Sequence, residues 1–449
     1  MRTGGTVQLM DLTIEQIASL APVGSAVAAG KKLATPRDWK YLGQNPAAIW
    51  GECQGSALYQ IRVDLSELAY NCTCPSRKLP CKHVLGLLFL AAGSSKAVPA
   101  GEPPAWVSDW LTKRAARAAQ REGKKEKEAK PADPAAQARR AEQREKRVAE
   151  GLDRLDLWMH DLVRNGLAGL ERQPPSFWEE PAKRLIDAQA PGLAARLRSV
   201  AELVGSNPAW PGLTLAQLGR LALTSHGYRR LTELAPLLQA DVRQIIGWTI
   251  QQDELQAQGG ETLADTWLIL GQRVEDEDRL RVQRTWLLGT KTGRRALILQ
   301  FSAAGQPFPE TIIPGTSVAG ELIFWPSGFP QRARFHSRQG EPRPITGPLP
   351  GSPNCDAFLD DVSAALARQP WIERFLAVLN RVLVVPREDG NWLIRDESAA
   401  GLPLRDGEHW SLLALAGGSP VDLAGEWDGY TLRPLGCWAE GGYHLLTGS

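Results

Sequence analysis

The chain has 449 residues, of which 43% are apolar and 16 are tryptophans, a composition that supports several buried cores and excludes a wholly disordered protein. The formal net charge is only +2, which excludes a strong basic field over the whole molecule but leaves room for a local basic patch. No run of about eighteen uncharged apolar residues occurs, so we expect no transmembrane span. Asp11 and Glu15 interrupt the first apolar stretch, which is unlike a secretory signal, and we therefore expect a cytoplasmic protein.

The first hundred residues predict a small mixed unit. Residues 11–20 have helical spacing, and residues 49–54 and 57–63 predict two strands joined by a two-residue turn, Gly55-Ser56. Residues 68–73 predict a third extended segment. An apolar helix is expected over residues 84–93 and can end at Gly93. We treat residues 1–47 as an N-terminal segment and residues 48–93 as a separate module.

A charged segment follows. Residues 113–150 contain thirteen Lys or Arg and seven Asp or Glu, with almost no large apolar side chain. We therefore expect a linker over residues 94–150 that is at best partly helical.

The rest of the chain separates into a helical and a β-rich part. Residues 151–275 show helical spacing, beginning with Leu152, Leu155, Trp158, Met159 and Leu162. Residues 276–449 predict short strands, interrupted by a helical pair over 356–367 and 371–380, with β-like segments again towards the end, including 410–418. The predicted fold class is α+β: a small ββα module, a helical middle region and a β-rich C-terminal region.

Half of the six cysteines of the chain are crowded into NCTCPSRKLPCKH, residues 71–83. Cys72 and Cys74 are two apart, so on an extended segment both thiols point to the same side. Six residues later, Cys81 and His83 stand at the expected start of the apolar helix, whose N-terminus favours a thiolate. The spacing thus brings two ligand pairs together.

Three thiolates and one imidazole form a closed tetrahedral set, which is typical of structural zinc. Soft sulfur ligands argue against magnesium or calcium, and an iron–sulfur cluster normally takes four cysteines. Simple burial or a disulfide are the other interpretations of these cysteines, and zinc is the one we favour. We expect Cys53 to be a core residue near the site, and Cys355 and Cys437 to be ordinary buried thiols.

The order of hairpin, Cys-x-Cys, loop, Cys-x-His and helix resembles the SWIM zinc finger. WGECQGS and CPSRKLPCKHVLGLLFL are similar to bacterial SWIM-domain proteins, as is the general texture of GLDRLDLWMHDLVRNGLAGL and of the C-terminal tail. The resemblance implies a ββα zinc finger with Cys72, Cys74, Cys81 and His83 as ligands, and contacts to protein or DNA. Bacterial members are often encoded near MoxR-type AAA+ ATPases and von Willebrand factor A proteins, which implies such a protein as partner.

Nucleic-acid binding is the alternative function. Arg77, Lys78 and Lys82 surround the site and could contact phosphates or a partner, with Arg37, Lys40 and Arg62 close in sequence. The helix VLGLLFLAA carries no polar side chain for base edges, so we expect any such contact to be weakly sequence-specific.

No catalytic motif stands out. The sequence lacks the P-loop, HExxH and GxSxG patterns, and the remaining histidines are scattered singly. We therefore predict an interaction protein and no enzyme, although a spatially assembled site in the C-terminal region stays open at this point.

Overall fold

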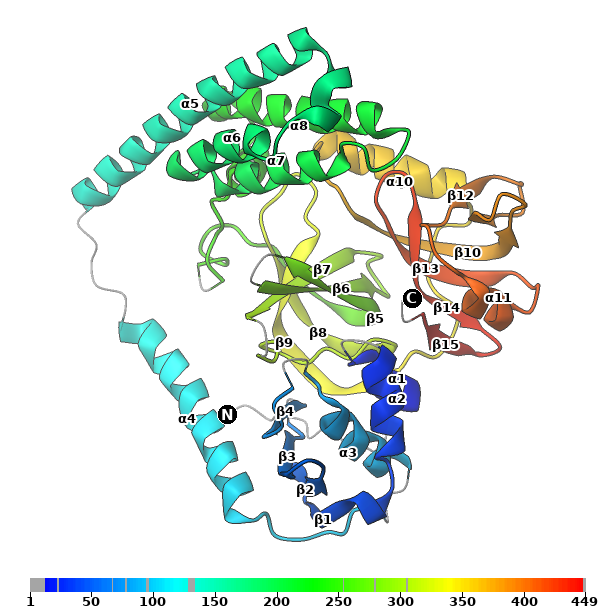
Figure 1. The fold of residues 1–449 in the computed structure, drawn as a ribbon. Coiled ribbons are helices and arrows are strands. Elements are labelled where there is room, and N and C mark those ends of the chain that lie inside the picture. Colours follow the sequence, from blue (N-terminus) through cyan, green and yellow to red (C-terminus); the bar gives the residue numbers. More distant parts are fainter. Residues whose placement is uncertain are drawn as a thin grey trace.

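The computed structural model describes residues 13–21, 24–66, 68–76, 79–93, 97–127, 134–252, 254–277, 280–303 and 306–446. Figure 1 shows a small N-terminal module, a central barrel, a C-terminal sheet beside the barrel, and a bundle of helices at the opposite end from the module. The predicted α+β class, with a zinc-finger-like module, helical middle and β-rich C-terminal part, is confirmed. No helix among the described residues is long and apolar enough to cross a membrane.

The N-terminal module is a four-stranded antiparallel sheet packed on helices. Its sheet has the order β1-β2-β3-β4. The elements are α1 (Ile14–Ser19), α2 (Gly24–Lys32), a short 3-10 turn η2 (Pro36–Asp38), β1 (Trp39–Gln44), β2 (Ala48–Gln54), β3 (Leu58–Asp64), β4 (Ala69–Cys72) and α3 (Lys82–Gly93).

Two details of this module differ from the sequence-based expectation. The expected boundary at residue 47 separates β1 from β2, but Trp39 pairs with Cys53 and Gly43 with Trp50 in one sheet. The hairpin between β2 and β3 has three loop residues, closed by the Gly55 amide donating to the Ala57 carbonyl at 2.9 Å. Residues 13–93 therefore form one unit.

Helix α3 is the centre of that unit. Residues 83–91 are all buried, because α1, α2 and the sheet surround the helix on every side. Its approach to α2 depends on two glycines: a Cβ added at Gly86 would lie 2.8 Å from the Leu33 Cβ, and one at Gly30 would lie 2.8 Å from the Leu85 Cβ. The apolar run on α3 is thus explained by complete burial.

The expected charged linker contains two long helices, α4 (Ala105–Lys127) and α5 (Pro134–Asn165). The first turns of α4 pack on the outer face of the module sheet, where Val107 is buried with Ala48 and Trp50. The expectation of a partly helical spacer was wrong for residues 105–127 and 134–150, since Ala, Arg, Lys and Glu all favour helices despite the lack of large apolar residues.

The helical region is a bundle in which the predicted face of α5 is buried: Leu152, Leu155, Met159 and Leu162 are each at most 6% exposed. Its last helix ends at Ile246, and residues 262–275 lie in a strand, so the boundary expected at 275 comes too late. The further elements are η3 (Leu167–Arg172), α6 (Ser176–Asp187), α7 (Pro191–Leu203), α8 (Trp210–Arg229), η4 (Leu231–Glu233) and α9 (Pro236–Ile246).

The central unit is a closed barrel of strands in the order β5-β6-β7-β9-β8. Trp267, Leu287 and Phe324 fill its interior and are completely buried or nearly so. The strands are β5 (Thr262–Glu277), β6 (Leu280–Gly289), β7 (Arg295–Ala303), β8 (Thr316–Phe324) and β9 (Arg332–Pro344).

The C-terminal sheet has the order β12-β11-β10-β13-β14-β15. Two expectations failed here: residues 371–380, predicted as a helix, mostly belong to β10, and residues 410–418, predicted as β-like, contain helix α11. The elements are α10 (Cys355–Arg368), β10 (Phe375–Pro386), β11 (Trp392–Arg395), β12 (Gly401–Pro403), α11 (Trp410–Ala416), β13 (Val421–Trp427), β14 (Leu432–Ala439) and β15 (Gly442–Leu445).

Candidate metal centre

The four predicted ligands come from the end of a strand and the start of a helix. Cys72 is the last residue of β4, and Cys74 follows in the loop. Cys81 immediately precedes α3, and His83 is the second residue of that helix. Two hydrogen bonds join the loop after β4 to β3. The backbone amide of Gln60 donates to the Thr73 hydroxyl at 2.9 Å, and the backbone amide of Thr73 donates to the backbone carbonyl of Gln60 at 3.1 Å. Both pairs thus lie as the spacing predicted.

The ligand atoms converge. The sulfur atoms of the three cysteines and a ring nitrogen of His83 all lie within 4.8 Å of one another, the one such group of His, Cys, Asp or Glu residues in the described part of the chain. The His83 Nδ1 is 3.9 Å from the Cys72 Sγ and 3.9 Å from the Cys81 Sγ. A tetrahedral zinc ion separates such atoms by roughly 3.5 to 3.8 Å. The cluster therefore fits a zinc ion closely.

The acid–base properties of the thiols point to the same ion. A hydrogen bond from the Cys72 thiol lowers the pKa of Cys81 to about 4. The same contact, followed by burial, raises the pKa of Cys72, and burial raises the pKa of Cys74. In the metal-free cluster these shifts favour a thiolate at Cys81 and neutral thiols at Cys72 and Cys74, because three neighbouring thiolates would repel one another. A divalent cation replaces those two protons.

The other cysteines lie outside the cluster. Cys53 is completely buried in the core of the module, and burial raises the pKa of its thiol. It is close to the ligands, since the Cys81 charge contributes to that shift, but it is not among the four converging residues. Cys355 and Cys437 are buried elsewhere. The expected roles of all three are confirmed.

Two neighbours of the site make contacts that the sequence did not indicate. The ring centroid of Tyr59 lies 5.0 Å from that of His83. Arg62 donates to the Trp106 carbonyl at 2.7 Å and to Asn71 Oδ1 at 2.9 Å, and its guanidinium lies 5.6 Å from the Trp110 ring centroid. The alternating pattern of β3 places Tyr59 towards the helix, but only the docking of α4 reveals the partner of Arg62.

The predicted contact residues divide into three groups. Arg77 and Lys78 lie outside the described residues. Lys82, the first residue of α3, is exposed, as are Arg37 and Lys40. Arg62, by contrast, is half-buried and its guanidinium is held against α4 by its contacts with Trp106.

Comparison with known families agrees with this geometry. Residues 59–92 match the SWIM zinc finger, and residues 143–246 match the SWIM-associated four-helix bundle domain. No curated protein and no solved structure matches the chain significantly. The first match covers all four ligands and α3, and the second covers the bundle from α5 to α9. The chain thus contains a SWIM zinc finger, whose Cys72, Cys74, Cys81 and His83 fit a zinc ion, followed by a SWIM-associated four-helix bundle.

Proposed function

We propose that this chain is an interaction protein whose N-terminal module, held together by zinc, contacts a partner protein. The observation that supports this most strongly is the burial of α3 over residues 83–91. Since α3 and the zinc ligands form the interior scaffold, we expect the module to contact a partner through β1 and the β2–β3 hairpin and not through α3.

Exposed apolar side chains mark the surface in question. Tyr41 on β1 is 76% exposed and Leu58 at the start of β3 is 44% exposed. Tyr41 lies where the pairing of β1 with β2 shifts between Lys40 and Gly43, and it has a positive φ of 49°. A side chain held outward by strained backbone is a candidate contact residue.

A partner of this kind would be a MoxR-type AAA+ ATPase or a von Willebrand factor A protein. The support for these two classes is the resemblance of the sequence to bacterial SWIM-domain proteins, together with the two SWIM-type regions that the chain matches. The proposal assigns no catalytic activity to the chain and places it in the cytoplasm.

The test is direct binding between the purified chain and each purified candidate. Tyr41→Ser and Leu58→Ser should each weaken binding at least about fivefold, as removal of an interface anchor does. Leu157→Ser is the matched control, because Leu157 is 65% exposed but lies on α5. A contact through the module would be contradicted if all three changes weakened binding equally. It would also be contradicted if none of them weakened binding.

Contact with nucleic acid is the second candidate, supported by the exposed Lys82, Arg37 and Lys40. Because α3 is buried, such contact would go through phosphates. It predicts a DNA affinity that falls steeply with salt and that drops further when Arg77, Lys78 and Lys82 are changed to Ala. A gel-shift assay with no retardation at low salt would reject this candidate.

A further inference from the structure

A cleft of about 780 Å³ lies between the N-terminal module, the barrel and the C-terminal sheet. Its walls include parts of α1 and α2, the start of β4, parts of β5 and β6, the segment 307–312 and the start of β14. The volume is in the range of small-molecule sites, which is about 300–1,000 Å³. None of the zinc ligands lines it, so the cleft is separate from the metal centre.

The charges that line this cleft are unbalanced. Its basic lining residues are Lys31, Arg114, Arg273, Arg281 and Arg433. Among the described residues, the one acidic side chain in the lining is Glu310, and Arg338 already pairs with it at 2.6 Å. Arg114 pairs with Asp64 at 3.2 Å, and the other four cations still leave the lining with an excess of positive charge.

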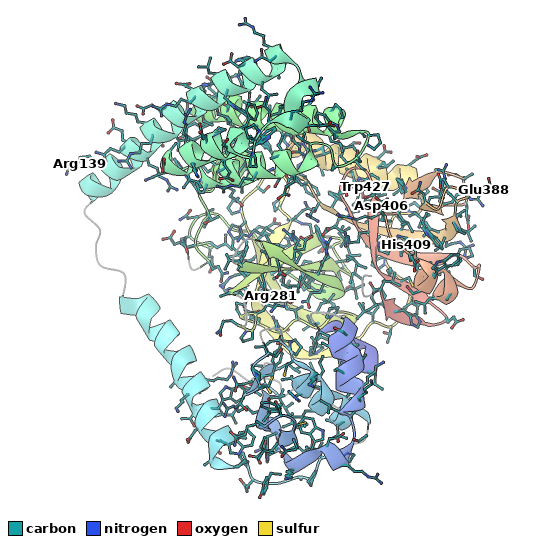
Figure 2. All side chains as sticks on the ribbon, in the orientation of Figure 1. Arg139, Arg281, Glu388, Asp406, His409 and Trp427 are labelled. Atoms are coloured by element: carbon teal, nitrogen blue, oxygen red, sulfur yellow. The ribbon has the colours of Figure 1, made fainter. Side chains whose placement is uncertain are left out.

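Arg281 on β6 is the most confined of these cations. It is 9% exposed, and its guanidinium lies 5.0 Å from the ring centroid of Phe308, another lining residue. Its buried Nη1 has no hydrogen-bond partner among the described residues. Figure 2 places Arg281 on the part of the barrel that faces the N-terminal module. A buried guanidinium with a free donor is costly unless an acceptor arrives.

Arg273 and Arg433 show the same deficit. The buried Arg273 Nη1 and Arg433 Nε lack partners among the described residues, although Arg273 pairs through Nη2 with Glu275 at 2.7 Å. Burial lowers the pKa of Arg433 to about 10, and the charge of Arg273 acts in the same direction. The two guanidinium groups are thus close enough to repel each other.

The nearby carboxylates are already engaged by other arginines. Glu275 also forms an ion pair with Arg284, and Glu426 forms one with Arg374. Glu426 further accepts a hydrogen bond from the Trp286 indole at 2.8 Å. The free donors of Arg273, Arg281 and Arg433 are therefore available to an acceptor that enters the cleft.

We propose that this cleft binds an oligophosphate, either inorganic or as the phosphate chain of a nucleotide. Guanidinium groups match phosphate oxygens in charge and in planar geometry. Several arginines with free donors favour an anion that carries several charges. Because the lining comes from three units, the ligand would also tie the module to the barrel and the C-terminal sheet.

The test is calorimetric titration of the zinc-loaded full chain with tripolyphosphate and with ATP at low salt. Both should bind, and added salt should weaken the binding. Arg281→Gln and Arg433→Gln should each weaken it about ten- to a hundredfold, the effect of losing one charge-assisted contact. Tighter binding of ATP would show that the nucleoside also occupies the cleft, and equal binding would limit the ligand to the phosphate chain.

Controls separate this site from other effects. Arg230→Gln should bind like the unchanged protein, since Arg230 is 70% exposed in the helical region and pairs with Glu233. Arg433→Gln should not lower the midpoint of thermal unfolding, because it removes a half-buried charge whose Nε has no partner among the described residues. It should abolish the rise in that midpoint caused by tripolyphosphate. Zinc content, measured before and after titration, excludes metal extraction by the ligand.

Three results would overturn the proposal. The first is that neither tripolyphosphate nor ATP binds at low salt. The second is that both arginine variants bind these anions as tightly as the unchanged protein does. The third is that citrate, a tricarboxylate, binds as tightly as tripolyphosphate.

Discussion

At the scale of single residues, the module contains two kinds of cysteine with different tasks. Cys74 is one of the four converging ligands, whereas Cys53 is completely buried beside them in the core. Cys74→Ala should lose zinc, because three remaining ligands leave the coordination sphere open. Cys53→Ala should keep one zinc per chain and lose only packing energy. Elemental analysis of the two purified variants checks this, and zinc loss in both or in neither would contradict the assignment.

The protonation of the ligands gives a second prediction. The pKa of Cys81 is lowered to about 4, while the pKa values of Cys72 and Cys74 are raised. Zinc should therefore displace about two protons per ion, and its affinity should fall as the pH is lowered. Calorimetry in buffers of different ionisation enthalpy measures this number. Release of no protons, or of three, would show that the thiols are protonated differently.

The lowered pKa of Cys81 also affects the metal-free protein. The folded-state pKa of Cys81 is about 4, which lies below its value in the unfolded chain. The stability that the Cys81 thiolate gains from its hydrogen bond with Cys72 is therefore fully present above the unfolded pKa. It is lost as the pH falls through the folded value of about 4.

The ligands could be predicted because each pair is local in sequence and the spacing alone fixes its direction. The partner of Arg62 could not, because the carbonyl of Trp106 lies 44 residues away in a helix whose docking no short pattern signals.

At the scale of elements, α3 depends on close contact with α2. Gly86→Ala should destabilise the module by about 1–3 kcal/mol, because the added Cβ would lie 2.8 Å from the Leu33 Cβ. Amide hydrogen exchange within α3 should then be roughly 5- to 150-fold faster. Gly93→Ala, in the same helix with nothing within 4 Å of the added Cβ, should leave exchange unchanged or slow it. Equal effects at the two positions would contradict the packing.

The wrong element predictions have physical reasons. Phe375 to Leu379 are five consecutive buried residues, since the strand is covered on both faces, so the alternation that marks a strand is lost. Helix α11 is only seven residues long, and apolar runs of that length fit a buried strand equally well. The hairpin of β2 and β3 was predictable because its strands alternate and glycine marks its turn.

At the scale of the whole molecule, the module is built partly from distant sequence. Ile313, which follows the barrel strand β7, is 3% exposed in the core of the N-terminal module. The Thr311 hydroxyl donates to the Leu68 carbonyl at 3.0 Å, and the side-chain amide of Gln16 donates to the Gly315 carbonyl at 3.2 Å. No local pattern could predict these contacts, because they depend on how separate units pack.

This arrangement predicts that two neighbouring substitutions destabilise different units. Ile313→Ala should destabilise the module by about 2–5 kcal/mol and speed exchange in α3. Ile312→Ala should instead loosen the barrel, because Ile312 is buried in the barrel core. Hydrogen exchange followed peptide by peptide separates the two results, and the same pattern for both variants would show that the segment does not divide its side chains between the cores.

The central claim is that one zinc ion holds β4, the following loop and α3 in place. Its most direct measurement is hydrogen exchange of residues 48–92 in the intact chain, before and after removal of zinc by a chelator. We predict that exchange in this segment rises strongly on chelation, while the helical region over residues 143–246 stays protected. Unchanged exchange over residues 48–92 in protein shown to be free of zinc would contradict the claim.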